Sequence, residues 1–232
     1  WVAYQTAFLK ANYPSEYMAA VMSRSLSNIT DITKLMDECK AMGIQTLGPD
    51  VNESNLKFTV NHDGNIRFGL GAVKGVGEAA VQSIVEERNT NGPFKGIFDF
   101  VQRVNLNACN KKNMECLALA GGFDSFPELK REQYFAVNSK GEVFLETLMR
   151  YGNRYQEDKR AAINSLFGGA NVVDIATPEI PQGVERWGDL ERLNKERDLV
   201  GIYLSAHPLD EFAIVLDLSL IHISEPTRPE PI

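Results

Sequence analysis

Residues 66–88 read IRFGLGAVKGVGEAAVQSIVEER, and this stretch is the strongest local indication of a fold in the chain. Its centre places Gly75, Val76 and Gly77 between a short apolar segment and a longer one whose apolar residues recur at helical spacing. Glycine has no Cβ, so it adopts backbone angles that other residues avoid and lets the chain approach a ligand closely. The stretch therefore predicts a helix-hairpin-helix, with a first helix over about residues 69–74 and a second helix directly after Gly77.

A helix-hairpin-helix of this kind is suited to binding phosphate. The first amides of the second helix lack intrahelical acceptors, and the helix dipole adds partial positive charge at the same end. We expect Gly75, Val76 and Gly77 to donate backbone amides to phosphate, with Lys74 adding a full charge beside them. We also expect the Val76 side chain to point inward and hold the two helices together. Because phosphates carry no base identity, such a site binds duplex DNA without sequence specificity.

The residue pattern leaves other interpretations open. A Gly-x-Gly element is often an ordinary structural turn, and glycine-rich loops also bind nucleotides. The nucleotide interpretation fits less well, because the two Gly-x-Gly elements, at residues 69–71 and 75–77, do not have the dinucleotide-binding spacing and no second parallel strand follows. A rival of another class is a protein-interaction or scaffold module that uses the hairpin for protein contacts.

A second, degenerate copy of the motif is predicted over residues 92–123. A Gly-Pro pair opens it, an apolar helix face follows over residues 97–104, and a further helix starts at residues 110–113. Tandem copies of the motif can grip both strands of a duplex, so we expect Lys111 and Lys112 to reach phosphate. The alternative is that these two lysines form a solvated helix start.

The flanking segments predict a mainly α-helical protein with one small β-hairpin. Residues 57–60 and 65–68 alternate around an Asp-Gly turn, which is typical of a hairpin. Residues 166–185 are predicted to be a loop because they are rich in glycine and proline. The other segments are predicted to be helical: residues 3–11 and 14–27, a third helix capped by Thr30 and stopped at Gly43, residues 126–160, and about 187–200.

The composition restricts the classes of function. A net charge of −7 taken alone argues against nucleic-acid binding and favours the scaffold interpretation. Residues 65–113, however, carry seven cations against four anions, and a locally positive segment is a candidate nucleic-acid footprint. The three cysteines form no Cys-x-x-Cys pair, so neither a zinc site nor a disulfide framework is expected. No apolar run reaches the roughly 18 residues that span a bilayer, so we expect a cytoplasmic protein without a membrane partner.

Both ends of the chain suggest a fragment. Trp1 stands where an initiator Met is usual, and residues 218–228 resemble the translation of a sequencing-library adaptor. We therefore expect residues 218–232 to be an assembly artefact that does not fold.

Taken in order, these motifs resemble the α subunit of bacterial DNA polymerase III, a replicative C-family polymerase. The resemblance covers about residues 1–217 in unbroken order and includes AYQTAFLK (3–10), YPSEYMAA (13–20), PDVN (49–52), residues 68–77, GGFD (121–124) and residues 196–210. It implies that residues 1–45 end the fingers region and that residues 46–125, with the β-hairpin and the tandem helix-hairpin-helix, hold the template–primer duplex. Residues 126–217 then form a helical connector that leads into an OB-type domain.

The family carries out template-directed nucleotidyl transfer with two metal ions, Mg²⁺ in the parent polymerase, held by carboxylates. The resemblance places those carboxylates in a palm domain before Trp1, and no acidic cluster in this chain matches their motif. The fragment alone is therefore expected to be inactive, with no catalytic residue, metal or other cofactor.

Family members also carry a clamp-binding peptide of the form Gln-x-x-Leu-Phe. Residues 163–167 match it at Leu166 and Phe167, with Ile163 in place of Gln. The resemblance implies that Ser165, Leu166 and Phe167 bind the sliding clamp through two apolar anchors, and that other replicase subunits are partners. The alternative is that the two apolar residues pack on the core of the fragment itself.

Overall fold

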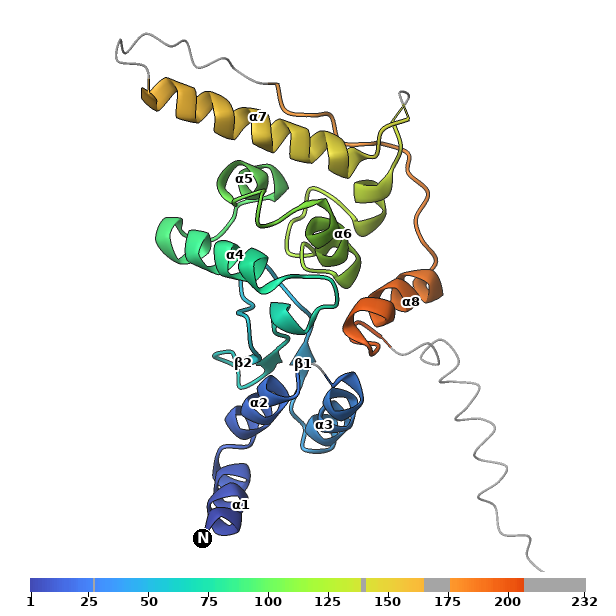
Figure 1. The fold of residues 1–232 in the computed structure, drawn as a ribbon. Helices are drawn as coiled ribbons and strands as arrows, with labels where there is room; N and C mark the ends of the chain where they lie inside the picture. The colour runs from blue at the N-terminus through green and yellow to red at the C-terminus, as the bar shows by residue number, and fades with distance from the viewer. Residues whose placement is uncertain (27, 139–140, 165–175, 207–232) are drawn as a thin grey trace, which may run out of the picture.

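The computed structural model describes residues 1–26, 28–138, 141–164 and 176–206. The described chain is mainly α-helical with one small sheet, as predicted. Figure 1 shows three N-terminal helices at one end, the sheet and the hairpin region in the middle, and a long helix at the opposite end. The last described helix returns to the side of the predicted helix-hairpin-helix region.

Three helices open the chain: α1 (Val2–Asn12), α2 (Pro14–Arg24) and α3 (Ile29–Ala41). Pro14 occupies the first turn of α2, where its missing N–H breaks no helical hydrogen bond. Asn28, and not Thr30, caps the third helix, because Asn28 Oδ1 accepts the amide of Asp31 at 3.3 Å. Gly43 follows this helix with a φ of +74°, which is the predicted left-handed stop.

The sheet has three strands, β1 (Thr46–Leu47), β2 (Thr59–Val60) and β3 (Ile66–Arg67), in the order β1-β3-β2. β2 and β3 pair antiparallel around the Asp-Gly turn, so the predicted hairpin is confirmed. β1 pairs with β3 in parallel, and this pairing is absent from the sequence prediction. A strand this short shows no alternation of apolar and polar residues, so its pairing appears only in the folded chain.

In the predicted helix-hairpin-helix, the segment before the Gly75–Gly77 turn is a single 3₁₀ turn, η1 (Leu70–Ala72), and not the helix predicted over residues 69–74. Competing backbone hydrogen bonds explain the difference. The amides of Leu70 and Gly71 donate to the carbonyls of residues 55 and 56, at 2.8 and 3.0 Å. Gly71 permits this approach, since a Cβ there would lie 2.7 Å from the Leu56 carbonyl oxygen. These bonds fix the start of the turn, while the Lys74 amide, which would donate to the Leu70 carbonyl in a helix, donates to the Leu199 carbonyl at 2.9 Å. A distant segment therefore takes the hydrogen bond that would extend the turn into a helix.

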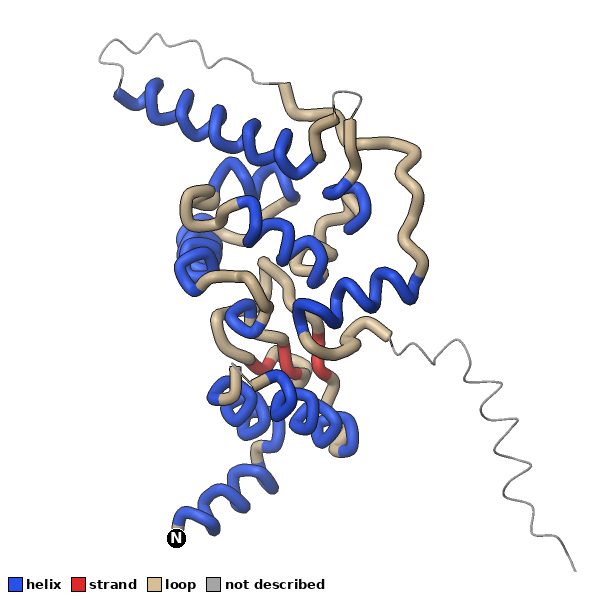
Figure 2. Tube along the Cα trace, turned by 45° about the vertical axis from the view of Figure 1, so that its right-hand side comes forward, coloured by secondary structure: helices blue, strands red, loops and turns tan. Residues whose placement is uncertain are grey.

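The remaining helices follow the prediction more closely. The first hairpin region, which is the predicted helix-hairpin-helix around Gly75–Gly77, contains α4 (Glu78–Asn91). The second hairpin region, which is the copy predicted over residues 92–123, contains α5 (Ile97–Arg103) and α6 (Lys111–Ala120). In place of the helix expected over residues 126–160 are η2 (Arg131–Phe135) and α7 (Phe144–Asn164). The last described helix is α8 (Asp189–Val200), which ends at Gly201 in the left-handed conformation. Figure 2 shows residues 176–188 as a loop that runs from the side of α7 to α8.

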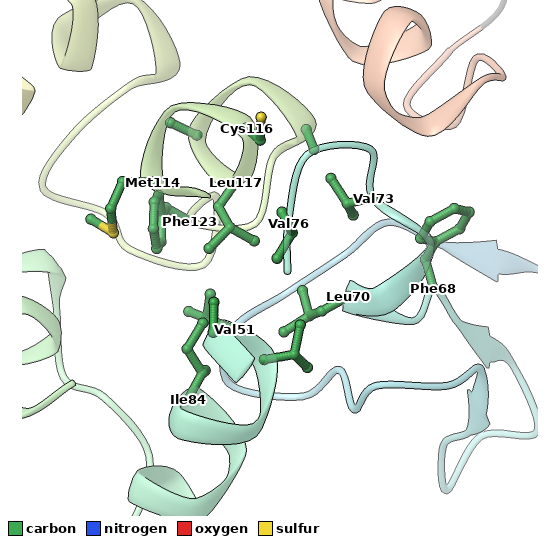
Figure 3. Close-up of a cluster of buried hydrophobic side chains, with 14 of the residues drawn as sticks. Val51, Phe68, Leu70, Val73, Val76, Ile84, Met114, Cys116, Leu117 and Phe123 are labelled. Atoms are coloured by element: carbon green, nitrogen blue, oxygen red, sulfur yellow. The ribbon is translucent and has the colours of Figure 1, made fainter. Parts of the chain in front are cut away.

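One continuous core joins the hairpin to the helices around it. Figure 3 shows side chains from the turn, η1, α4 and α6 gathered in one cluster, which includes Leu70, Val76, Ile84 and Leu117. Val76 is only 9% exposed, so its side chain points inward as predicted. Burial of each such side chain contributes about 1.5–3 kcal/mol, and the turn is therefore held firmly against α4 and α6.

Two groups of predictions lie outside the described residues. The residues predicted to bind a clamp, Ser165, Leu166 and Phe167, fall in the undescribed stretch 165–175. The residues predicted to be an artefact, 218–232, fall in the stretch 207–232. Within the described ranges, none of the helices combines the length and the apolar character needed to cross a bilayer.

Candidate nucleic-acid interface

The hairpin turn spans Val73 to Val76. The Val76 amide donates to the Val73 carbonyl at 3.1 Å, and Gly75 takes a φ of +87° at the third position. This is the arrangement of a type II turn, which favours glycine at that position. Gly75 is also required for packing, because a Cβ there would lie 2.7 Å from Cys116 Sγ of α6. The turn is thus closed against α6.

Two helix N-termini meet at this turn. Gly77 is the N-cap of α4, and its amide donates to Asn113 Oδ1 of α6 at 3.2 Å. Asn110 caps α6 itself, since its Oδ1 accepts the Asn113 amide at 3.1 Å. A Cβ built on Gly75 would lie 3.9 Å from Lys112 Cε, so the Lys112 side chain lies close to the turn. The partial positive charges of two helix starts therefore add in one place.

Three lysines surround these helix starts, but they are not equivalent. Lys74 and Lys112 are exposed, and neither forms an ion pair within the part of the chain that the structure describes. Lys111 is paired with Glu146 of α7 and, at 3.7 Å, with Glu115. The hydrogen bond that Lys111 donates to Glu146 raises the pKa of Lys111. Lys111 is therefore charged, but carboxylates already compensate its charge.

Most amides of the turn are used within the protein. Lys74 donates its amide to the Leu199 carbonyl of α8 at 2.9 Å, while Val76 and Gly77 make the two bonds given above. The expectation that Gly75, Val76 and Gly77 all donate to phosphate is therefore corrected for Val76 and Gly77. Both amides have acceptors in the folded chain, so they serve the shape of the turn.

The amides that remain lie at Gly75 and at the start of α4. Gly75, Glu78 and Ala79 have no acceptor for their amides among the described residues, and all three are exposed. The first N–H groups of a helix have no intrahelical partner by geometry. The Glu78 carboxylate lies in the same first turn, and its negative charge weakens the attraction for an anion. The site therefore offers a few amides and two uncompensated lysines.

The described residues do not fit the two-metal site of a polymerase. Within those ranges, no group of three His, Cys, Asp or Glu side chains is placed to hold a metal ion. The three cysteines are free and buried, and burial raises the pKa of Cys109 to about 12 and that of Cys39 to about 11. Thiols with such high pKa values stay protonated and unreactive at neutral pH.

Two residues at the site have roles that the sequence does not predict. Asn113 is expected only as part of a helix start, yet it is buried and bonded to the turn of the other hairpin region. Leu199 is expected only as an apolar residue of the last helix, yet its carbonyl accepts the Lys74 amide. The one available signal is the polar Asn113 at the third position of a helix, where a side-chain acceptor often caps an amide.

The fold and the site together define a helix-hairpin-helix protein. A family model described as a helix-hairpin-helix motif matches residues 43–134, a range that includes the turn and α4 to α6. The matched range contains both Lys74 and Lys112.

Curated proteins extend the likeness beyond the motif. The chain is 37% identical over 214 residues to DNA polymerase III subunit alpha of Vibrio cholerae. It is 40% identical to that of Pseudomonas fluorescens over 219 residues and 39% identical to that of Chlamydia muridarum over 217 residues. These alignments cover 90–91% of this chain and 16–19% of the relatives. The chain belongs to the DNA polymerase III subunit alpha family, as the resemblance implies, and spans less than a fifth of the length of these relatives.

Proposed function

We propose that this chain binds the phosphate backbone of duplex DNA, without sequence specificity, as part of a replicative DNA polymerase. The observation that carries the proposal is the meeting of two helix starts at Gly77 and Asn113, with Lys74 and Lys112 beside them. Helix starts attract anions through their amides and dipoles, and lysine adds a full charge. The helix-hairpin-helix match and the names of the relatives support the same function.

The parent of this chain is, in this proposal, a DNA-directed DNA polymerase with its Mg²⁺-binding carboxylates in another part. We assign no catalytic residue to the chain described here. Its contribution is to hold the template–primer duplex near a catalytic site that lies elsewhere. Contacts to phosphate suit that task, because they are independent of base sequence and allow the protein to advance along any template.

Two protein partners belong to the same proposal. Ser165, Leu166 and Phe167 bind a sliding clamp, with Leu166 and Phe167 inserted as apolar anchors. Other replicase subunits contact the parent protein. A fluorescent peptide of residues 160–170 titrated with a bacterial clamp tests the first partner, and a Leu166→Ala/Phe167→Ala peptide that binds equally well contradicts it.

A protein-interaction module is the second candidate function. It is favoured by the net charge of −7 and by the pairing of Lys111 with Glu146. In this case the exposed turn contacts a protein surface, and the chain has no salt-dependent affinity for duplex DNA.

The deciding experiment is fluorescence anisotropy of the chain with a labelled primer–template duplex between about 50 and 200 mM salt. Lys74→Ala/Lys112→Ala should weaken binding and lower the slope of log affinity against log salt by about two, because each phosphate contact contributes about 0.9 to that slope. The matched control is Lys34→Ala/Lys40→Ala, which removes the same charge from α3, beyond the sheet (Figure 1). An affinity that does not change with salt concentration contradicts the proposed site. Equal weakening of binding by the two double variants also contradicts it.

A further inference from the structure

Asn113 makes three hydrogen bonds that reach two segments of the chain. Its side chain is buried, with 7% of the residue exposed. Oδ1 accepts the Gly77 amide at 3.2 Å, and Nδ2 donates to the Ala108 carbonyl at 2.9 Å. Its own amide donates to Asn110 Oδ1 at 3.1 Å. The side chain therefore connects the turn of the first hairpin region with the loop that leads into α6.

The arrangement is a capping box divided between two helices. In an ordinary capping box, the third residue of a helix accepts the amide of the cap residue of the same helix. Asn113 is the third residue of α6, but the amide that it accepts belongs to Gly77, the cap of α4. The hydrogen bond therefore sets where α4 starts relative to α6.

We infer that Asn113 is a positioning residue, which holds the turn that carries Lys74 and the helix start that carries Lys112 so that both engage one stretch of DNA backbone together. This inference rests on the proposed function. Asn113 occupies the Gly77 amide and joins the turn that carries Lys74 to the helix start that carries Lys112. When the turn and the helix start are held rigidly relative to each other, the first lysine–phosphate contact places the second lysine near its phosphate. The second contact then costs little further conformational entropy. When the hydrogen bond between Asn113 and Gly77 is lost, each lysine binds its phosphate independently of the other.

The test compares the effect of Lys74→Ala in four backgrounds of the full chain, by anisotropy with the same duplex. In the wild-type background the substitution should weaken binding about tenfold, and in the Asn113→Ala background less than about threefold. Asn110→Ala is the matched control, because it removes the cap of α6 and leaves the acceptor for Gly77 in place. In this control background, and with Asn113→Asp, which keeps that acceptor, the loss should again be about tenfold.

Each outcome decides a separate point. Equal losses in the wild-type and Asn113→Ala backgrounds overturn the inference and leave the proposed function intact. Wild-type binding that does not respond to Lys74→Ala overturns the proposed function itself. If Asn113→Ala does not fold, hydrogen exchange of the wild-type chain decides instead. The Gly77 amide should be protected in the free chain and should stay protected with duplex bound, and rapid exchange in the free chain overturns the inference.

Discussion

Arg131 and Glu196 form a buried ion pair, with 2.8 Å between Arg131 Nη1 and Glu196 Oε2 and exposed side-chain fractions of 8% and 1%. Glu196 Oε1 also accepts the Ser205 amide at 2.9 Å. The pair thus ties α8, and the chain that follows it, to the segment after α6. Because Lys74 donates its amide to Leu199 of the same helix, α8 also supports the turn of the candidate interface.

Loss of one partner of this pair should strongly destabilise the fold. Arg131→Met leaves the Glu196 carboxylate buried without its counter-ion, and such a change lowers the free energy of unfolding by about 3–5 kcal/mol. Urea denaturation measures this loss. Arg150→Met is the matched control, because it breaks an ion pair with Glu142 in which Arg150 is 61% exposed, and it should change stability little. Losses of similar size for the two variants would show that the buried pair has no special role.

The pH dependence of stability should also follow Glu196. Burial acts to raise the pKa of Glu196, but hydrogen bonds from Ser205 and Arg131 outweigh burial and hold that pKa below its ordinary value of 4.5. The stability that Glu196 contributes is therefore fully present above about pH 4.5, and it is lost as pH falls through the lower folded-state pKa. Glu196→Gln should flatten the decline of urea midpoints measured below pH 5.

Asp50 should show the opposite behaviour. Burial raises the pKa of Asp50, so the folded state holds its proton more tightly than the unfolded state does. Its contribution to stability is present at low pH and is lost as pH rises through the folded-state pKa. Asp50→Asn should therefore make the loss of stability in acid steeper. Urea midpoints that keep the wild-type pH profile in both variants would contradict both assignments.

Gly75→Ala should destabilise the turn in two separable ways. The φ of +87° costs about 1–2 kcal/mol for a residue with a Cβ, and the new Cβ would lie 2.7 Å from Cys116 Sγ. Gly75→Ala/Cys116→Ala should recover the stability lost to the contact with Cys116 but not the stability lost to the positive φ. Gly77→Ala is the control, because its φ is −78° and a Cβ there meets nothing within 4 Å. Equal free energies of unfolding for Gly75→Ala and Gly77→Ala would refute this account of the turn.

Release of Lys111 should strengthen DNA binding. Glu146→Gln removes the carboxylate that pairs with Lys111, so the lysine becomes available for a phosphate. Anisotropy should show tighter binding and a salt slope steeper by about 0.9. Asp158→Asn, at an exposed position of the same helix, removes the same charge without touching this pair. If both variants strengthen binding equally, the effect is one of general charge and Lys111 makes no phosphate contact.

Residue types alone were sufficient to predict the turn. Gly75 is required by backbone sterics at a positive φ, and Val76 beside it is the apolar residue that the turn buries. The same local chemistry places the helix stops at Gly43 and Gly201. For residues 69–74, where the predicted helix is wrong, a distant segment takes a hydrogen bond that the helix needs. The turn at Leu70 does not continue into a helix because the Lys74 amide bonds to the Leu199 carbonyl and not to the Leu70 carbonyl.

Local sequence was enough to predict helix limits such as Pro14, Gly43 and Gly201, the tight turn and the family, because each depends on residues close together in the chain or on their order along it. The tertiary structure alone decided which groups at the turn remain open to a ligand. The Gly77 amide donates to Asn113, which is 36 residues away, and the Lys111 ammonium pairs with Glu146, which is 35 residues away. A donor bonds to the acceptor that folding brings near it, and the spacing of residues along the chain does not specify which distant side chain arrives.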